Sequence, residues 1–220
     1  MKKIISAIIA SIFIGTFAHA ENYMGIKISA ANMDASGSHT TNSASSGGGG
    51  SAVTAAGNAD FHMASVFVEK STDFNGMDLS LGLDIIPFEA EVDSLGGGDG
   101  FDATVSVSNV ITAYIQPTIN TGGPVSVFIK GGYTMGDVEI TDISRQATTA
   151  GTASTDGDTS KTLEGFVYGV GVQANTDFGF VRLEGTYTDF DEISHTNSNS
   201  KVVKADAEMT LISISFGRSF

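Results

Sequence analysis

The sequence contains no cysteine. This absence excludes a disulfide scaffold and metal sites built on thiolates. An exported chain without disulfides needs another source of stability, and a closed β-sheet supplies one because every strand finds a partner on both sides. Tryptophan is absent too, so any aromatic anchors must come from the 14 phenylalanines and 5 tyrosines.

Positive charge is also scarce. The chain carries 11 Lys and Arg against 25 Asp and Glu, which gives a formal net charge of -14. So acidic a chain repels phosphate backbones, and this excludes nucleic acid as a partner held through charge. The balance suits a solvated surface or one that attracts divalent cations.

Long apolar runs are missing beyond the N-terminus. The first twenty residues combine Lys2 and Lys3, an apolar stretch over 4–17 and the small-residue pattern Ala18-His19-Ala20. This order predicts a cleaved signal peptide over residues 1–20, because the stretch is too short for a stable membrane-spanning helix. Residues 21–220 are then the mature protein, and their length fits one domain.

What the chain does contain is alternation. Segments that alternate apolar with polar or small residues predict eight strands, at 22–33, 61–71, 77–90, 104–118, 125–139, 162–174, 179–191 and 207–220. Short turns such as Asn75-Gly76 alternate with longer polar connections at 34–60, 91–103, 141–161 and 192–206. This rhythm predicts an all-β, eight-stranded antiparallel up-and-down transmembrane β-barrel with both termini in the periplasm.

The polar parity of these strands carries charged residues that we expect to face the barrel lumen. Burying such charges unpaired is costly, so we expect ion pairs among them, supported by inward Tyr114 and Gln116. The second strand is ambiguous, because its parity assigns no face to Glu69 or Lys70. The expected lumen network is Lys27, Asp78, Asp84, Lys130, Arg182 and Glu184. Eight strands enclose an interior that side chains fill, which favours a packed polar core; a narrow gated ion path is the alternative.

Two segments resemble a known family. Val181-Arg182-Leu183-Glu184-Gly185-Thr186-Tyr187-Thr188-Asp189-Phe190 is similar to the penultimate strand, and Ile212-Ser213-Ile214-Ser215-Phe216-Gly217-Arg218-Ser219-Phe220 to the closing strand, of the small outer-membrane barrels. That superfamily includes the OmpA transmembrane domain and the opacity-type surface proteins. The resemblance implies an outer-membrane location, insertion by the barrel-assembly machinery with Phe216 and Phe220 as the assembly signal, and contact with lipid and lipopolysaccharide. Arg218 departs from the pattern, since the family usually has an aromatic residue there. We do not expect the peptidoglycan-binding domain of full-length OmpA-type proteins, so the resemblance does not imply a wall-anchoring role.

Other candidate sites are weaker. The stretch 97–104 matches one copy of a calcium-binding nonapeptide that normally works in stacked repeats, and a flexible acidic turn over 93–102 is the alternative. The histidines after the leader are His39, His62 and His195, none in a distinctive catalytic spacing. We therefore expect no enzyme, no cofactor and no metal.

The first functional hypothesis is a structural and surface-interaction barrel. It would be a monomer that displays four polar extracellular loops to lipopolysaccharide, host, phage or other cells. The alternative is a narrow gated ion channel through the charged lumen. A rim enzyme acting on lipid is the third and least favoured hypothesis.

Overall fold

The computed structural model describes residues 21–40, 52–88, 90–92, 101–145, 159–196 and 202–220. The predicted signal peptide and most of the calcium-like stretch lie outside these ranges. Among the described residues, no helix is long and apolar enough to cross a membrane.

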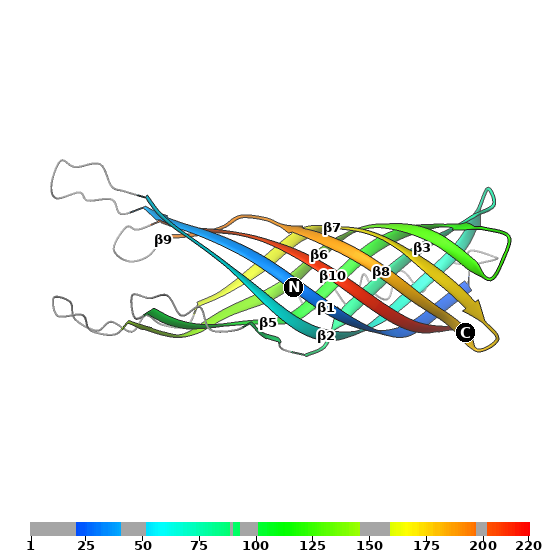
Figure 1. Ribbon diagram of the computed structural model, residues 1–220, viewed down its shortest axis with the longest axis horizontal. Coiled ribbons are helices and arrows are strands. Elements are labelled where there is room, and N and C mark those ends of the chain that lie inside the picture. The colour runs from blue at the N-terminus through cyan, green and yellow to red at the C-terminus, as the bar shows by residue number, and fades with distance from the viewer. Residues whose placement is uncertain (1–20, 41–51, 89, 93–100, 146–158, 197–201) are drawn as a thin grey trace.

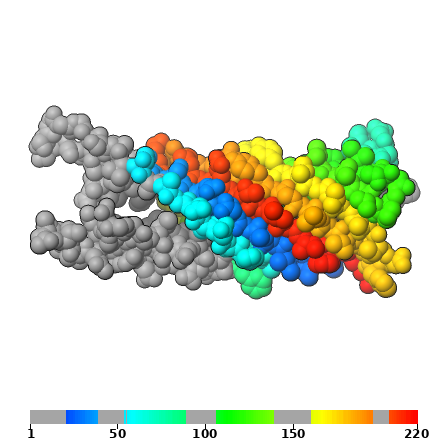
Figure 2. Space-filling model, viewed as in Figure 1, coloured from blue at the N-terminus to red at the C-terminus, as the bar shows by residue number. Residues whose placement is uncertain are grey.

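The chain forms one antiparallel sheet that closes on itself (Figure 1). Its neighbours follow chain order, and β1 pairs with β10 from Tyr23–Ser219 to Thr40–Val202, which completes the ring. The strands are β1 (Glu21–Thr40), β2 (Ala52–Phe74), β3 (Met77–Ile86), β4 (Ala90–Val92), β5 (Phe101–Asn120), β6 (Val125–Arg145), β7 (Thr159–Thr176), β8 (Gly179–Phe190), β9 (Ile193–Thr196) and β10 (Val202–Ser219). The strands run obliquely around an elongated body (Figure 2). The predicted eight-stranded up-and-down barrel is confirmed, with β4 and β9 as two short additions.

The short connections lie together at one end, which we call the turn end. Asn75 and Gly76 both have positive φ, 56° and 81°, as a two-residue hairpin turn between β2 and β3 requires. Gly122, with φ 81°, lies in the turn between β5 and β6. We call the opposite end, where β1 ends at Thr40 and β2 begins at Ala52, the loop end.

Strand lengths differ from the expectation at the loop end. The predicted long connections 34–60, 141–161 and 192–206 are partly strand, because β1 continues to Thr40, β6 to Arg145 and β10 begins at Val202. The prediction ends each strand where its outward face stops being apolar, whereas pairing continues beyond that point, with β1 paired to both β2 and β10.

Outward apolar side chains form a band around the middle and turn end of the barrel, which we call the belt. In β10, Ile212, Ile214 and Phe216 are exposed while Ser213 and Ser215 are buried. A closed sheet with apolar residues outside and polar residues inside is the arrangement of a membrane-spanning barrel. Other exposed members of the belt are Met24, Ile26, Ile28, Val66, Leu81, Ile115, Ile129, Val170, Val172 and Leu183.

The barrel divides beyond the belt. The last pair between β2 and β3 is Val66–Ile85, and the last between β7 and β8 is Gly165–Phe190. Past these levels the described residues form two four-stranded ribbons, β9–β10–β1–β2 and β4–β5–β6–β7. Figure 1 shows β9 and the tips of β1 and β2 on one side of the loop end, and β5 on the other. We call this divided part the collar: 32–40, 52–62, 90–92, 101–108, 136–145, 159–164, 189–196 and 202–210.

Candidate functional site: a charged lumen beneath an apolar chamber

The lumen at mid-barrel is filled by charged side chains held in place by the inward parity of their strands. Arg182 on β8 binds Glu69 on β2 through two bonds, 2.6 Å from Nη1 to Oε1 and 3.0 Å from Nη2 to Oε2. The same guanidinium donates to Gln173 Oε1 at 2.8 Å, and the Tyr114 hydroxyl donates to Glu69 Oε1 at 2.6 Å. All four hydrogen-bonding groups of this cluster lie inside the barrel, so the pair is screened little by solvent.

A second cluster lies beside the first. Lys130 on β6 pairs with Glu184 on β8, and Lys27 on β1 pairs with Asp84 on β3. The Lys27 Nζ also lies 3.9 Å from Glu184 Oε1, which links the two pairs into a chain of alternating charge. We call the two clusters together the ionic layer: Lys27, Glu69, Asp84, Lys130, Arg182 and Glu184.

Aromatic rings pack around the cations of this layer. The Arg182 guanidinium carbon is 4.7 Å from the Phe180 ring centre and 5.1 Å from that of Phe128, while Lys130 Nζ is 4.2 Å from that of Tyr114. Contacts of this kind stabilise a cation that has lost its water. Each inward ring lies over a glycine of the adjacent strand, where a Cβ would overlap the ring: Phe67 on Gly25, Tyr114 on Gly82, Phe128 on Gly171, Phe180 on Gly217.

The structure brings together five of the six predicted lumen residues. Asp78 differs: it lies on the inward parity near the turn end, where its carboxylate accepts a bond from Asn120 Nδ2 at 2.9 Å. Among the described residues Asp78 has no ion pair, and the Arg182 guanidinium is bonded to Glu69 and Gln173 instead. Glu69 is the residue that the sequence could not place; its inward neighbours Phe67 and Ser71 obscured the alternation of β2. Tyr114 and Gln116 are buried as expected.

Small voids flank the ionic layer. The cavity beside Lys27, Tyr114 and Glu184 has a volume of about 50 Å³, and that beside Asp78 and Arg182 about 20 Å³. Each can hold ordered water between polar groups, but neither is a continuous channel.

A third void of about 40 Å³ lies on the loop-end side of the ionic layer. Nine of its eleven lining residues are apolar, among them Met33, Phe61, Met63 and Leu163. We call it the apolar chamber. A β-bulge at Asn109, with φ 54° and a register shift between Ser108 and Ile111, turns both Val107 and Val110 toward this chamber.

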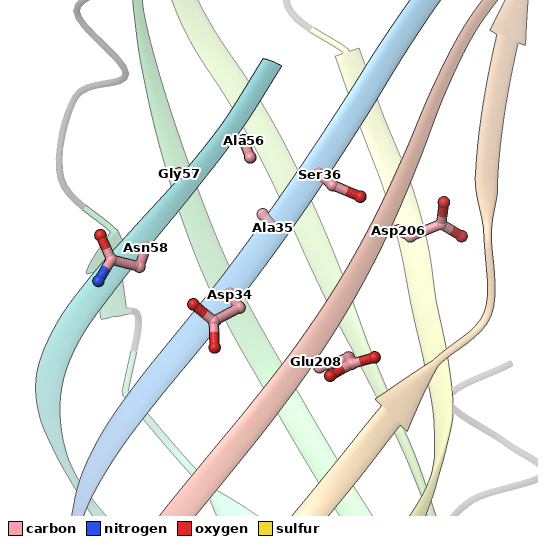
Figure 3. Close-up of a pocket in the computed structure, with 8 residues that line it drawn as sticks. All are labelled: Asp34, Ala35, Ser36, Ala56, Gly57, Asn58, Asp206 and Glu208. Carbon is pink, nitrogen blue, oxygen red and sulfur yellow. The ribbon is translucent and has the colours of Figure 1, made fainter. Parts of the chain in front are cut away.

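The outside of the collar is acidic. A surface hollow of about 380 Å³ lies over β2, β1 and β10, and Figure 3 shows Asp34, Asp206 and Glu208 around it with Asn58 and Ser36. Asp34 and Glu208 are directly opposed in the β1–β10 ladder.

The remaining predicted sites are these. Phe216 and Phe220 point outward, exposed by 46% and 66%, and the Phe220 amide donates to the Asn22 carbonyl at 3.0 Å. His62 is exposed on the outer face of β2. Among the described residues, no group of three or more His, Asp and Glu side chains could hold a metal ion.

Comparison with known proteins gives the following. No family model matches the chain, and no curated protein matches it. Solved structures similar to it include OprG of Pseudomonas aeruginosa (14% identity, 90% of this chain and 97% of that one, TM-score 0.46) and the outer membrane protease OmpT of Escherichia coli (9%, 91% and 97%, 0.45). Another is Ail, the attachment invasion locus protein of Yersinia pestis (14%, 89% and 99%, 0.35).

The ring of strands, the lipid-facing belt and the polar interior of this chain are those of an outer-membrane β-barrel protein.

Proposed function

We propose that this protein is a structural and surface-interaction barrel: a plugged membrane anchor that carries a polar collar beyond the membrane. The observation that supports the anchor role is the ionic layer. Six interlocked charges and four aromatic rings fill the cross-section, and the voids at that level have volumes of only about 50 and 20 Å³.

The collar is the proposed contact surface. Its outward residues on β1 and β10 include Asp34, Asp206 and Glu208, and the basic Lys204 on the same face is paired with Glu192. A concentration of negative charge steers positively charged partners toward it. We propose a basic surface as the partner, whether on a host protein, another cell or a phage.

Adhesion of cells that express the protein tests the contact role. Cells carrying Asp34→Asn, Asp206→Asn and Glu208→Gln together should bind a polylysine-coated surface less than cells with the wild-type protein. The control removes three charges at the turn end, with Glu21→Gln, Asp73→Asn and Asp177→Asn, and should leave adhesion unchanged. Equal adhesion of both triple variants would contradict the contact role of this ribbon.

Conductance tests the plugged anchor. The mature protein, refolded and inserted into a planar bilayer, should give no discrete current steps. Insertion is verified beforehand by protease protection. Regular small steps from the wild-type protein would overturn the plugged barrel and favour the second candidate.

That second candidate is a narrow gated ion channel. The observation in its favour is that Lys130 connects the two clusters of the ionic layer. It binds Glu184 in one cluster, and it lies over the ring of Tyr114, whose hydroxyl binds Glu69 in the other. Replacing Lys130 by Met should change the size or frequency of current steps if a channel exists. In a plugged barrel the same replacement chiefly lowers stability.

A rim enzyme acting on lipid is the least supported of the three. His62 is the histidine whose side chain the structure describes, and it lies on the outer face of β2. A His62→Ala variant tests this hypothesis. Its activity toward lipid should fall below that of the wild type if the rim is an enzyme, and its stability should stay the same.

A further inference from the structure

We infer that the apolar chamber binds the end of an unbranched hydrocarbon chain. The chamber lies where the outward belt ends and the collar begins, and residues from all eight long strands contribute to its wall. Three of its lining residues are methionines, Met33, Met63 and Met209. Unbranched thioether side chains adapt to ligands of varied shape, which suits a flexible alkyl chain.

The chamber offers a ligand no polar partner. Its one hydroxyl, that of Thr134, accepts a bond from Thr112 Oγ1 at 3.0 Å and donates to the Ile111 carbonyl at 3.5 Å. Water needs two to four polar partners to occupy a cavity, so this one favours hydrocarbon over water. The ionic layer closes it toward the turn end, because Lys130 and Glu184 line the next void along the barrel.

The size of the chamber selects the shape of its ligand. A cavity of about 150 Å³ is known to take a benzene ring. At about 40 Å³ this chamber is much smaller, so it accepts the terminal carbons of one chain and excludes rings.

Among the described residues, the hydrogen-bonded ladder of the barrel wall is interrupted at the same level. Among the described residues, β2 pairs with β3 only from Val66 to Phe74, so its segment 52–65 has no hydrogen-bonded partner on that side. Pro87, which has no backbone N–H, follows β3 there, and the adjacent Phe88 is 66% exposed. An open ladder is costly inside hydrocarbon, so this gap lies at the membrane boundary, where a chain that bends back from the bilayer centre or a free chain near the headgroups can enter it. Phe61 and Met63 on one side of the gap and Ile86 on the other also line the chamber.

Methionine methyl groups test the inference directly. With ¹³C-methyl methionine in lipid nanodiscs, added n-decane should shift the Met33, Met63 and Met209 signals saturably. The lipid-facing Met24 is the internal control and should change only in proportion to decane partitioned into the membrane. Proportional, unsaturated change at all four methyl groups would overturn the site. Saturable binding of cyclohexane as tight as that of decane would overturn the selection for a chain.

Filling the chamber should weaken binding. Leu163→Phe should weaken decane binding by about tenfold, the equivalent of two methylene groups no longer buried. Because that variant can fail to fold, Gly136→Ala is the second test: its Cβ would lie 2.9 Å from Val110 Cγ2 and intrude on the chamber. Gly131→Ala on the same strand has open space around its Cβ and is the matched control. Equal affinity in Gly136→Ala and Gly131→Ala would contradict the chamber as the binding site.

Two sources could supply the chain, a free fatty acid or a membrane phospholipid. A nitroxide in the middle of the stearic acid chain, away from the methyl end that enters the chamber, distinguishes them when the acid is added free or esterified in the nanodisc phospholipid. Broadening of the three chamber methyl signals beyond that of Met24 identifies the source. Broadening of Met24 alone, with both probes, would refute the inference.

Discussion

The belt and the collar are built from the same strands with opposite polarity. On β10 the outward residues change from Ile214 and Ile212 in the belt to Glu208 and Asp206 in the collar. The inward residues change in the reverse sense, from Ser213 to Leu211 and Met209. The same reversal occurs on β7, where outward Val170 gives way to Glu164 and inward Gly171 to Leu163.

The reversal follows the solvent of each region. In the belt the outside meets hydrocarbon, so the interior must satisfy polar groups among themselves, as the ionic layer does. In the collar the outside meets water, and apolar residues gather inside, as in a soluble two-sheet protein. The two ribbons of the collar face each other across this apolar interior, and among the described residues the one backbone bond that continues past the last β7–β8 pair runs from the Asp191 amide to the Glu164 carbonyl at 2.8 Å. The belt is therefore held by backbone pairing all round, and the collar by side-chain packing between ribbons.

The largest expected effect comes from the interior of the belt. Arg182→Met should lower the free energy of unfolding by about 3–5 kcal/mol, because it leaves the Glu69 carboxylate buried without its cation. Urea unfolding in vesicles, followed by the shift of the folded form on gels, measures this loss. The double variant Arg182→Met with Glu69→Gln should recover part of it. A single variant as stable as the wild type would mean that water replaces the guanidinium.

The interior of the collar should respond as a packed core. Leu163 is 6% exposed inside the collar, whereas Val170 on the same strand is 62% exposed on the belt. Leu163→Ala should cost about 2–5 kcal/mol, as other core truncations do. Val170→Ala, which only reduces contact with lipid, should cost less than about 1 kcal/mol. Similar losses in both variants would contradict the reversal of polarity.

The outer surfaces provide the next comparison. Ile28 and Ser36 share the outward face of β1, one in the belt and the other in the collar. Ile28→Lys should cost about 2–4 kcal/mol, because it places a charge against lipid. Ser36→Lys should change stability by less than about 0.5 kcal/mol in water. The same unfolding assay measures both, and a costly Ser36→Lys would place the membrane boundary further toward the loop end.

Particular residues show what the sequence could predict. Belt strands such as 125–139 were clear, because outward Val127 and Ile129 alternate with inward Ser126 and Lys130. The collar strands were missed for a physical reason: Asp34 and Ser36 alternate with Ala35 and Gly37, small residues whose inward face gives little hydrophobic contrast. The face of Glu69 could not be predicted, because β2 has apolar residues on both faces, Phe67 inward and Val66 outward. The inward phenylalanines fit only because glycines face them, and that pairing depends on register, which the sequence of one strand does not contain.

The division of the collar should appear in amide exchange along one strand. Both parts of β2 pair with β1, but only residues 66–74 also pair with β3. Amides of 52–65 that point away from β1 should therefore exchange at least about tenfold faster than those of 66–74. Hydrogen exchange followed by mass spectrometry of the reconstituted protein measures the ratio. Uniform protection along β2 would show that another segment completes the ladder.

The smallest effect is expected at the surface of the collar. Lys204 Nζ lies 2.7 Å from Glu192 Oε1, and both side chains are nearly half exposed. The hydrogen bond from Lys204 to Glu192 raises the pKa of Lys204 above its ordinary value of 10.5. Any stability from this pair is present below that ordinary value and is lost as the pH rises through the raised pKa. Exposed pairs contribute little, so Glu192→Gln should leave the thermal midpoint at pH 7 unchanged within error. A clear drop in the midpoint would mean that the Lys204–Glu192 pair holds β10 against the chain that follows β8. The collar would then be stabilised by charge as well as by its apolar interior.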